Sequence, residues 1–200
     1  MNYFFDDRKK KESSPEKICA DILHGRQLAF SRVTIIGAPG SGKSFLSYAL
    51  EALIAVPIIH LDTLFWNADG SHISHEELRG KIEGIVAQNQ WFIDGNYTDS
   101  IELRLKYAQL VIFLDLPSEE CVSGLRMRAN SPRKEMPCVI DELEPGFVEY
   151  VRNFRTSTRN QIIKLLKQNP AANILHLYTR EEVNLFIRIV KAHISPHISE

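Results

Sequence analysis

Short runs of apolar residues alternate with segments in which apolar residues recur every three or four positions. The runs predict buried strands over residues 33–36, 57–61, 91–93, 110–114 and 173–178. The amphipathic segments predict helices over residues 44–54, 74–88, 100–107, 119–129, 145–168 and 181–192. Near-continuous apolar strands that alternate with helices are typical of a parallel sheet covered on both faces. The pattern therefore predicts a doubly wound, three-layer α/β/α domain with five parallel strands.

The first residues of the chain do not follow this alternation. A charged run over residues 6–12 is followed by two serines and Pro15, a combination that favours a helix start. We therefore expect residues 1–30 to form a helical N-terminal extension and residues 31–200 to form the main domain.

The overall composition agrees with a globular domain. The 200 residues are 44% hydrophobic and 24% charged, which is enough apolar material for a core. The net charge of −1 provides no general basic surface, so we do not expect direct nucleic-acid binding. No apolar stretch reaches the roughly 18–20 residues that span a bilayer, and the charged N-terminus lacks the apolar run of a secretion signal. We therefore expect a cytoplasmic protein with no membrane partner.

The segment between the first predicted strand and helix carries the strongest chemical signal. Residues 37–44 read GAPGSGKS, which matches the phosphate-binding P-loop pattern G-x-x-x-x-G-K-[ST] at every fixed position. Glycines in such a turn let successive N–H groups converge on phosphate oxygens, and the following helix adds its positive dipole end. We therefore expect a purine nucleoside triphosphate, ATP or GTP, together with Mg²⁺. The expected nucleotide contacts are Gly37, Pro39, Gly40, Ser41, Gly42, Lys43, Ser44 and Phe45.

Specific roles follow for two residues of this loop and for one carboxylate. Lys43 would reach the β- and γ-phosphates, and the Ser44 hydroxyl would bind Mg²⁺. A carboxylate for Mg²⁺ or its water should follow a neighbouring strand, and both Asp94 and Asp115 do so. A Gly-Asn turn follows Asp94 and leaves it at the open carboxyl edge of the sheet. We therefore favour Asp94 as the Mg²⁺ residue, acting through water, and Asp115 as a strand-end cap.

The second predicted strand leads into the segment IIHLDTLFW. His60 and Asp62 lie two positions apart, so their side chains point to the same side if the strand continues through them. Asp62 could accept the proton of an acceptor hydroxyl or orient the acceptor. Phe65 and Trp66 could form an apolar wall beside it. The alternative is a turn-forming aspartate followed by two core aromatic residues.

Two groups of arginines follow the fourth predicted strand. The first group is Arg126, Arg128 and Arg133. The second group, on one face of the helix expected over residues 145–168, is Arg152, Arg155 and Arg159. Phosphoryl transfer spreads negative charge over oxygens that guanidinium groups bind well. We therefore expect a mobile lid here, with Arg128 and Arg133 as catalytic candidates, and the alternative is a solvated helix face.

In their order along the chain, these segments resemble a known family. The chain is similar to the bacterial topology modulation proteins, small P-loop proteins related to adenylate and shikimate kinases. The similarity rests on the segments GAPGSGKS, IIHLDTLFW, WFIDGNYTDSIELRLKYAQLVIFLDLP and FVEYVRNFR. It covers residues 32–190, and the H-L-D-x-L-F-W and I-D-G-N-Y blocks make it specific. The resemblance implies a kinase-like core with parallel strand order 2-3-1-4-5 and a lid after the fourth strand.

The resemblance also implies roles for individual residues. Asp62 matches the acidic acceptor position of shikimate-type kinases, and Asp94 matches the acidic position after the third strand of adenylate kinases. Arg104 falls on the helix that borders the acceptor site in these proteins. The chain departs from the family at its N-terminal extension and at residues 131–141, where Arg133 of the lid is retained.

These expectations favour an ATP-dependent phosphotransferase, similar to nucleoside monophosphate kinases or shikimate kinases, that acts on an unidentified small acceptor. The expected catalytic residues are Lys43, Asp62, Asp94, Arg128 and Arg133. The expected acceptor-binding residues are Asp62, Phe65, Trp66 and Arg104. With an alcohol acceptor, Asp62 would be the base, whereas with a nucleoside monophosphate it would only position the acceptor.

Two alternative functions remain open at this stage. One is a non-enzymatic or weakly hydrolytic ATP-binding regulator of the topology modulation type, in which ATP moves the lid and the N-terminal extension contacts a partner. The other is direct nucleic-acid binding through the arginine face of residues 152–159, which would weaken steeply as salt rises.

Overall fold

The computed structural model describes residues 23–24, 27–28, 30–54, 56–129, 133–139 and 143–194. Its centre is a parallel sheet made of β3 (Arg32–Gly37), β4 (Ile58–His60), β5 (Trp91–Asp94), β6 (Leu110–Leu114) and β7 (Asn173–Leu177). The order across the sheet is β4-β5-β3-β6-β7. The predicted three-layer fold and strand order 2-3-1-4-5 are therefore confirmed, and β3, which leads into the GAPGSGKS loop, is the central strand.

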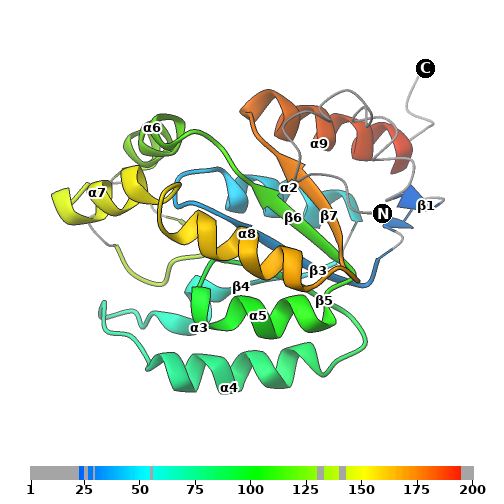
Figure 1. The fold of residues 1–200 in the computed structure, drawn as a ribbon, viewed down its shortest axis with the longest axis horizontal. Helices are drawn as coiled ribbons and strands as arrows, with labels where there is room; N and C mark the ends of the chain where they lie inside the picture. Colours follow the sequence, from blue (N-terminus) through cyan, green and yellow to red (C-terminus); the bar gives the residue numbers. More distant parts are fainter. Residues whose placement is uncertain are drawn as a thin grey trace.

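Helices cover both faces of this sheet (Figure 1). The helices α2 (Lys43–Ile54) and α9 (Arg180–Ile194) pack together on one face. On the other face α5 (Thr98–Tyr107) packs against α8 (Thr158–Gln168), and α4 (His75–Val86) packs against α5. All five residues of β6 are buried between these layers, as expected for a central strand of a parallel sheet.

Local sequence signals explain how the helices begin and which face they bury. In α4 the Ser74 hydroxyl accepts a hydrogen bond from the Glu77 amide at 3.1 Å, which caps the helix. Leu78, Ile82 and Val86 recur every four residues and form the buried face of the same helix. Apolar spacing and capping residues together therefore predict this helix well.

Three further helices lie at the carboxyl edge of the sheet. The short helix α3 (Leu61–Phe65) starts directly after β4, and α6 (Ser118–Arg128) starts shortly after β6. Helix α7 (Pro145–Asn153) packs against α6. Because ligands of doubly wound sheets bind at this edge, these helices and the loops beside them are where a site is expected.

The predicted helix over residues 145–168 is wrong as a single element. The structure has α7 and α8 in its place, separated by turns over residues 154–157. The hydroxyl groups of Thr156 and Ser157 donate to the Asn153 carbonyl oxygen at 3.0 and 2.7 Å. The backbone amides of Thr156 and Ser157 donate to the same oxygen at 3.1 Å. The backbone then leaves the helical conformation at Ser157, with φ −114° and ψ −91°, so the helix is interrupted here.

The second strand also ends earlier than predicted. Strand β4 stops at His60, and α3 begins at Leu61, so Asp62 lies in the first turn of a helix. The Thr63 hydroxyl donates to the His60 carbonyl oxygen at 2.7 Å and closes this turn. The strand therefore does not continue through Asp62, so His60 and Asp62 do not lie on one side of a strand.

The N-terminal prediction falls mostly outside the described residues. The helix start near Pro15 lies there, whereas β1 (Leu23–His24) and β2 (Gln27–Leu28) form a short antiparallel pair. Among the residues that the structure does describe, none of the helices combines the length and the apolar character needed to cross a membrane.

Candidate functional site

The loop between β3 and α2 turns sharply because its glycines allow it. Gly40 and Gly42 have φ angles of 78° and 95°, in the left-handed region that favours glycine. The Ser41 amide donates to the Ala38 carbonyl oxygen at 3.1 Å and closes the turn. Helix α2 begins at Lys43, so the unpaired amides of its first turn face the loop. The strand, loop and helix arrangement predicted for an anion-binding loop is present.

The Lys43 side chain lies inside this loop. Its ammonium group donates to the Ala38 carbonyl oxygen at 3.0 Å. Burial lowers the pKa of Lys43, and the charges of Asp94 and Asp62 act in the opposite direction. Three of the predicted catalytic residues, Lys43, Asp62 and Asp94, are therefore close enough to influence one another.

Contacts from outside hold the loop in place. A methyl group on Gly40 would lie 2.0 Å from the Cys121 carbonyl oxygen, so α6 rests directly on the loop backbone. The Arg180 guanidinium donates to the Gly40 carbonyl oxygen at 3.2 Å. On the side facing β5, the Gly37 amide donates to Asn96 Oδ1 at 3.4 Å. The loop is therefore fixed to α6, to α9 and to the turn after β5.

A cavity of about 960 Å³ opens beside the loop, and we call it the loop cavity. Its lining comes from the loop, α2, α6, α9 and residues 133–135. The predicted nucleotide residues that line it are Gly40, Ser41, Gly42, Ser44 and Phe45. Phe45 and Met127 also line it and are 60% and 81% exposed, so the cavity offers apolar surface next to the loop.

A second cavity of about 250 Å³ adjoins the first, and we call it the aromatic cavity. Its apolar lining includes the rings of Phe65, Trp66, Tyr97, Phe147 and Tyr150. Its polar lining includes His60, Asp62, Asp94, Asn96 and Lys43, and Pro39 of the loop also borders it. Three residues, Ser44, Arg128 and Arg133, line both cavities. The structure therefore brings the predicted acceptor residues Asp62, Phe65 and Trp66 next to the phosphate loop.

A buried pair of polar residues lies at the end of β4 and β5. His60 Nδ1 is 2.9 Å from Asp94 Oδ2, and the two residues are paired in the register of these strands. Burial lowers the pKa of His60, but the hydrogen bond and charge of Asp94 outweigh burial and leave the pKa raised. Within the described part of the chain, Asp94 Oδ1 and His60 Nε2 are buried without a hydrogen-bond partner. Both residues therefore keep one polar atom for a further ligand.

Asp62 is held by Tyr97, a residue to which the sequence assigned no role. The Tyr97 hydroxyl donates to Asp62 Oδ1 at 2.7 Å. Burial raises the pKa of Asp62, although this hydrogen bond and the charge of Lys43 act against it. Tyr97 has a φ of 34°, which is left-handed and unusual for a residue with a side chain. The Gly-Asn turn before it was the available signal, because such turns aim the next side chain in an uncommon direction.

A carboxylate from the segment after α6 reaches the loop cavity. Glu135 accepts a hydrogen bond from the Tyr48 hydroxyl at 2.8 Å and lies 3.7 Å from Arg133 Nη1. Burial raises the pKa of Glu135, but hydrogen bonds from its own backbone, Tyr48 and Ser44 outweigh burial and lower it. Sequence reasoning missed Glu135, because a single carboxylate in a polar segment carries no periodic or motif signal.

Arg104 does not line the aromatic cavity, contrary to the prediction that it contacts the acceptor. Its side chain is fully buried, and Nη1 donates to Thr34 Oγ1 at 2.9 Å and to the Gly95 carbonyl oxygen at 2.8 Å. Nη2 donates to the Asn96 carbonyl oxygen. The guanidinium group is therefore used to hold the turn that follows Asp94, and it is not presented to a ligand.

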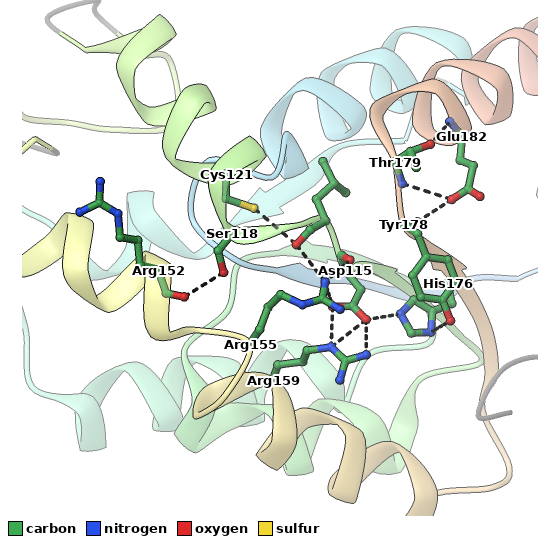
Figure 2. Close-up of polar contacts among 11 residues, drawn as sticks. Asp115, Ser118, Cys121, Arg152, Arg155, Arg159, His176, Tyr178, Thr179 and Glu182 are labelled. Carbon is green, nitrogen blue, oxygen red and sulfur yellow. Dashed lines mark hydrogen bonds and ion pairs between the residues drawn. The ribbon is translucent and has the colours of Figure 1, made fainter. Parts of the chain in front are cut away.

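Asp115 belongs to a separate cluster of charges, shown in Figure 2. Its carboxylate accepts from Arg159 at 2.6 to 2.8 Å and from Arg155 at 3.4 Å, and it lies 2.8 Å from His176 Nε2. Burial raises the pKa of Asp115, but hydrogen bonds from His176 and Arg159 outweigh it and leave the pKa lowered. Asp115 lines neither cavity, whereas Asp94 lines the aromatic cavity.

The second arginine group is used mainly inside the protein. Arg155 and Arg159 pair with Asp115, and Arg152 lies 3.6 Å from Glu119. Arg128 and Arg133, the preferred candidates of the lid, line both cavities, and Arg180 of α9 lines the loop cavity.

Comparison with solved structures finds proteins with a similar fold. The shikimate kinase from Acinetobacter baumannii, solved with shikimate, is 13% identical with a TM-score of 0.57, and the match covers 86% of this chain and 97% of that one. The shikimate kinase from Bacteroides thetaiotaomicron is 17% identical with a TM-score of 0.52, covering 80% and 96%. No protein-family profile matches the chain, and no curated protein matches its sequence. The chain therefore has the P-loop α/β/α fold that these two shikimate kinases have.

Proposed function

We propose that the protein is an ATP-dependent phosphotransferase that moves the γ-phosphoryl group to a hydroxyl group of a small acceptor. The observation that carries this proposal is the junction of the two cavities at Ser44, Arg128 and Arg133. The loop cavity contains the phosphate-binding backbone, and the aromatic cavity contains the carboxylate of Asp62. A donor and an acceptor bound in these cavities would meet beside the three shared residues.

The two sequence blocks that resemble topology modulation proteins support an acceptor site at this place. Residues of both blocks line the aromatic cavity, namely His60, Asp62, Phe65, Trp66, Asp94, Gly95, Asn96 and Tyr97. These blocks are distant in the chain but form one wall, which is expected if the pair of motifs serves a common ligand.

We assign the binding of the nucleotide, which donates the phosphoryl group, to the GAPGSGKS loop. The amides from Gly37 to Ser44 would hold the phosphates, and Lys43 would neutralise the β- and γ-phosphates. Phe45 and Met127 offer exposed apolar surface in the loop cavity, which supports contact with the nucleobase. Arg128 and Arg133 would neutralise the phosphoryl group during transfer, because they border both cavities.

The oxygen atoms present fit a Mg²⁺ ion. Mg²⁺ prefers hard oxygen ligands, and the Ser44 hydroxyl lies at the start of α2, next to the loop. Asp94 Oδ1 is buried and, among the described residues, has no hydrogen-bond partner. We assign Ser44 as a direct ligand and Asp94 as a ligand through water. When bound, Mg²⁺ neutralises charge on the β- and γ-phosphates.

The residues of the aromatic cavity can carry the proton of the transfer step. The acceptor oxygen bonds to the γ-phosphorus while the bond from that phosphorus to the β–γ bridging oxygen breaks, and ADP leaves with the electron pair of that bond. We assign the acceptor's hydroxyl proton to Asp62 Oδ2, since Tyr97 already donates to Oδ1. Asp62 is thus the proposed general base, and Tyr97 holds it in position.

A second candidate function is supported by Glu135. Its carboxylate accepts hydrogen bonds from Tyr48 and Ser44, so it occupies the place next to the proposed Mg²⁺ ligand. Binding of nucleotide and Mg²⁺ would have to displace Glu135 and the segment that carries it. A regulator that signals ATP through this movement, without phosphoryl transfer, uses the same contacts.

A screen with labelled ATP distinguishes the two functions. Nucleosides, nucleoside monophosphates and small hydroxy compounds are incubated with the protein, Mg²⁺ and γ-labelled ATP, and calorimetry measures ATP binding in parallel. Label in at least one acceptor supports the transferase. Binding of ATP with no labelled acceptor supports the regulator, and absence of ATP and GTP binding by folded protein contradicts both.

A further inference from the structure

The aromatic cavity is lined by charges of both signs. Asp62 and Asp94 supply two carboxylates, and Lys43, Arg128 and Arg133 supply the cations. Lys43 and Arg133 act electrostatically on Asp62, and Lys43 also acts on Asp94. Arg128 and Arg133 border the loop cavity as well, where the triphosphate would bring its own negative charge. We therefore assign these cations to the phosphates of the nucleotide.

The guanidinium group of Arg104, which could have bound an anionic acceptor, makes its hydrogen bonds inside the protein. Arg104 is fully buried, and it donates to Thr34 Oγ1 and to the carbonyl oxygens of Gly95 and Asn96. Carboxylate and phosphate groups are usually bound by the fork of an arginine. In the described lining of the aromatic cavity, the cations are Lys43, Arg128 and Arg133, all of which the proposed function assigns to the phosphates of the donor. An anionic group on the acceptor would face Asp62 and Asp94 without an arginine of its own.

The remaining polar and apolar groups of the lining suit hydroxyl groups and C–H surfaces. His60 Nε2 and Asn96 Nδ2 are buried and, over the described ranges, have no hydrogen-bond partner. A hydroxyl group can both donate and accept, so it can satisfy either atom. The Phe65 ring lies 5.3 Å from Trp66 and 5.0 Å from Tyr97, and these rings form a continuous apolar wall.

From these three observations we propose that the acceptor is an uncharged polyhydroxy compound of about the size of a sugar. The proposal rests on the proposed phosphotransferase function and narrows its substrate class. The volume of about 250 Å³ lies below the usual range of ligand pockets, roughly 300–1,000 Å³, which favours a single small ring. Nucleoside monophosphates and hydroxy acids are excluded by their charge.

Matched pairs of acceptors test the charge directly. The pairs are glucose with glucuronate, adenosine with AMP, and methyl shikimate with shikimate, and glucosamine is the cationic comparison. Phosphorylation with ATP and Mg²⁺ is followed by mass spectrometry. We expect kcat/KM for the uncharged member to exceed that of the charged member at least tenfold. A preference for the anionic member or for glucosamine overturns the proposal.

A binding measurement separates this proposal from the proposed function. If ATP binds but no acceptor is phosphorylated, the transferase function fails, and the fluorescence of Trp66 then decides the acceptor class. The same compounds are titrated with a non-hydrolysable ATP analogue and Mg²⁺ present, and a Trp66→Phe variant shows which signal arises in the cavity. Tighter binding of uncharged members supports the proposal. Tighter binding of charged members, or no binding by any member, overturns it.

A variant gives a third readout of the same inference. Asp62→Asn removes one negative charge from the aromatic cavity while keeping the shape of the side chain. In the fluorescence titration, we expect the preference for the uncharged member of each pair to fall at least threefold. Asp69→Asn, at an exposed position outside the cavity, is the matched control and should leave the ratio unchanged. An Asp62→Asn variant with an unaltered ratio contradicts the proposed source of the selectivity.

Discussion

A methyl group on Gly124 of α6 would lie 2.2 Å from the carbonyl oxygen of Gly40 in the phosphate loop. The same methyl group would lie 2.8 Å from Arg180 Nη2, which itself donates to that carbonyl oxygen. Helix α6 and the loop therefore approach each other at a point where only hydrogen fits. The shape of the loop depends on a residue that lies outside its own motif.

Gly124→Ala should therefore distort the loop from the outside. We expect the free energy of unfolding to fall by about 1–3 kcal/mol, as overpacking usually costs, and ATP affinity to fall with it. Gly80→Ala is the matched control, because Gly80 lies inside α4 with open space around it. It should stabilise by roughly 0.5–1 kcal/mol. Urea unfolding and calorimetry with ATP measure both effects, and equal behaviour of the two variants would contradict the contact.

Lys43→Met should remove phosphoryl transfer and leave the fold intact. The ammonium group donates within the loop and is placed to meet phosphate, whereas methionine has similar length and no charge. We expect the transfer rate to fall at least about 100-fold, as it does when a group that stabilises transition-state charge is lost. Lys81→Met, on the exposed side of α4, is the control. A Lys43→Met enzyme with unchanged transfer would refute the role given to this residue.

Asp62→Asn tests the general base. An amide cannot take the proton of the acceptor, so kcat should fall by roughly 10²–10⁴ while ATP affinity stays near that of the unaltered protein. The control Asp69→Asn lies at an exposed turn and should keep full activity. Steady-state kinetics and calorimetry are needed together. A rise in the acceptor KM with constant kcat would show that Asp62 only positions the acceptor.

Arg104→Lys separates a structural role from acceptor binding. Lysine cannot reproduce the planar contacts to Thr34 and the Gly95 and Asn96 carbonyl groups, so buried acceptor atoms lose partners. If lysine keeps one of these three contacts, the two acceptors left unsatisfied should lower the free energy of unfolding by about 2–4 kcal/mol. Thermal and urea unfolding provide the measurement. Unchanged stability with a tenfold rise in acceptor KM would instead support the acceptor contact that the resemblance implied.

The Asp115 cluster predicts a pH dependence of stability. The pKa of Asp115 is lower in the folded state than its ordinary value of about 3.9. Its contribution is therefore fully present above about pH 4 and is lost as the pH falls through the lower folded-state pKa. Asp115→Asn should cost about 3 kcal/mol at pH 7, and this difference should shrink in acid. Urea unfolding of both proteins from pH 3 to 7 tests this, and a constant difference would contradict it.

The sequence predicted features that depend on neighbouring residues better than features that depend on contacts between distant residues. The GAPGSGKS loop, the buried run of β6 and the capped helix α4 depend on neighbours in the chain, and each was predicted correctly. The break after Asn153 was missed, because the backbone leaves the helical conformation at Ser157 within a segment of good helical periodicity.

The candidate site shows the same difference between local signals and long-range contacts. Asp94 was favoured from its turn and lies in the aromatic cavity, but its partner His60 is 34 residues away. Arg104 was placed by resemblance alone, and its contact to Thr34 spans 70 residues. The Tyr48 and Glu135 contact spans 87 residues. Only the folded backbone brings such pairs together, so no periodicity or motif could reveal them.

In the proposed reaction, the residues common to both cavities would link the binding of the nucleotide thermodynamically to the binding of the acceptor. A ligand that positions Ser44, Arg128 and Arg133 from one cavity would also position them for a ligand in the other. Any gain that the nucleotide gives to acceptor affinity must be returned in equal measure by the acceptor to the nucleotide. In the proposed reaction, mutual strengthening of this kind would favour the complete ternary complex over either binary one. It would also limit loss of the phosphoryl group to water when only one partner is present.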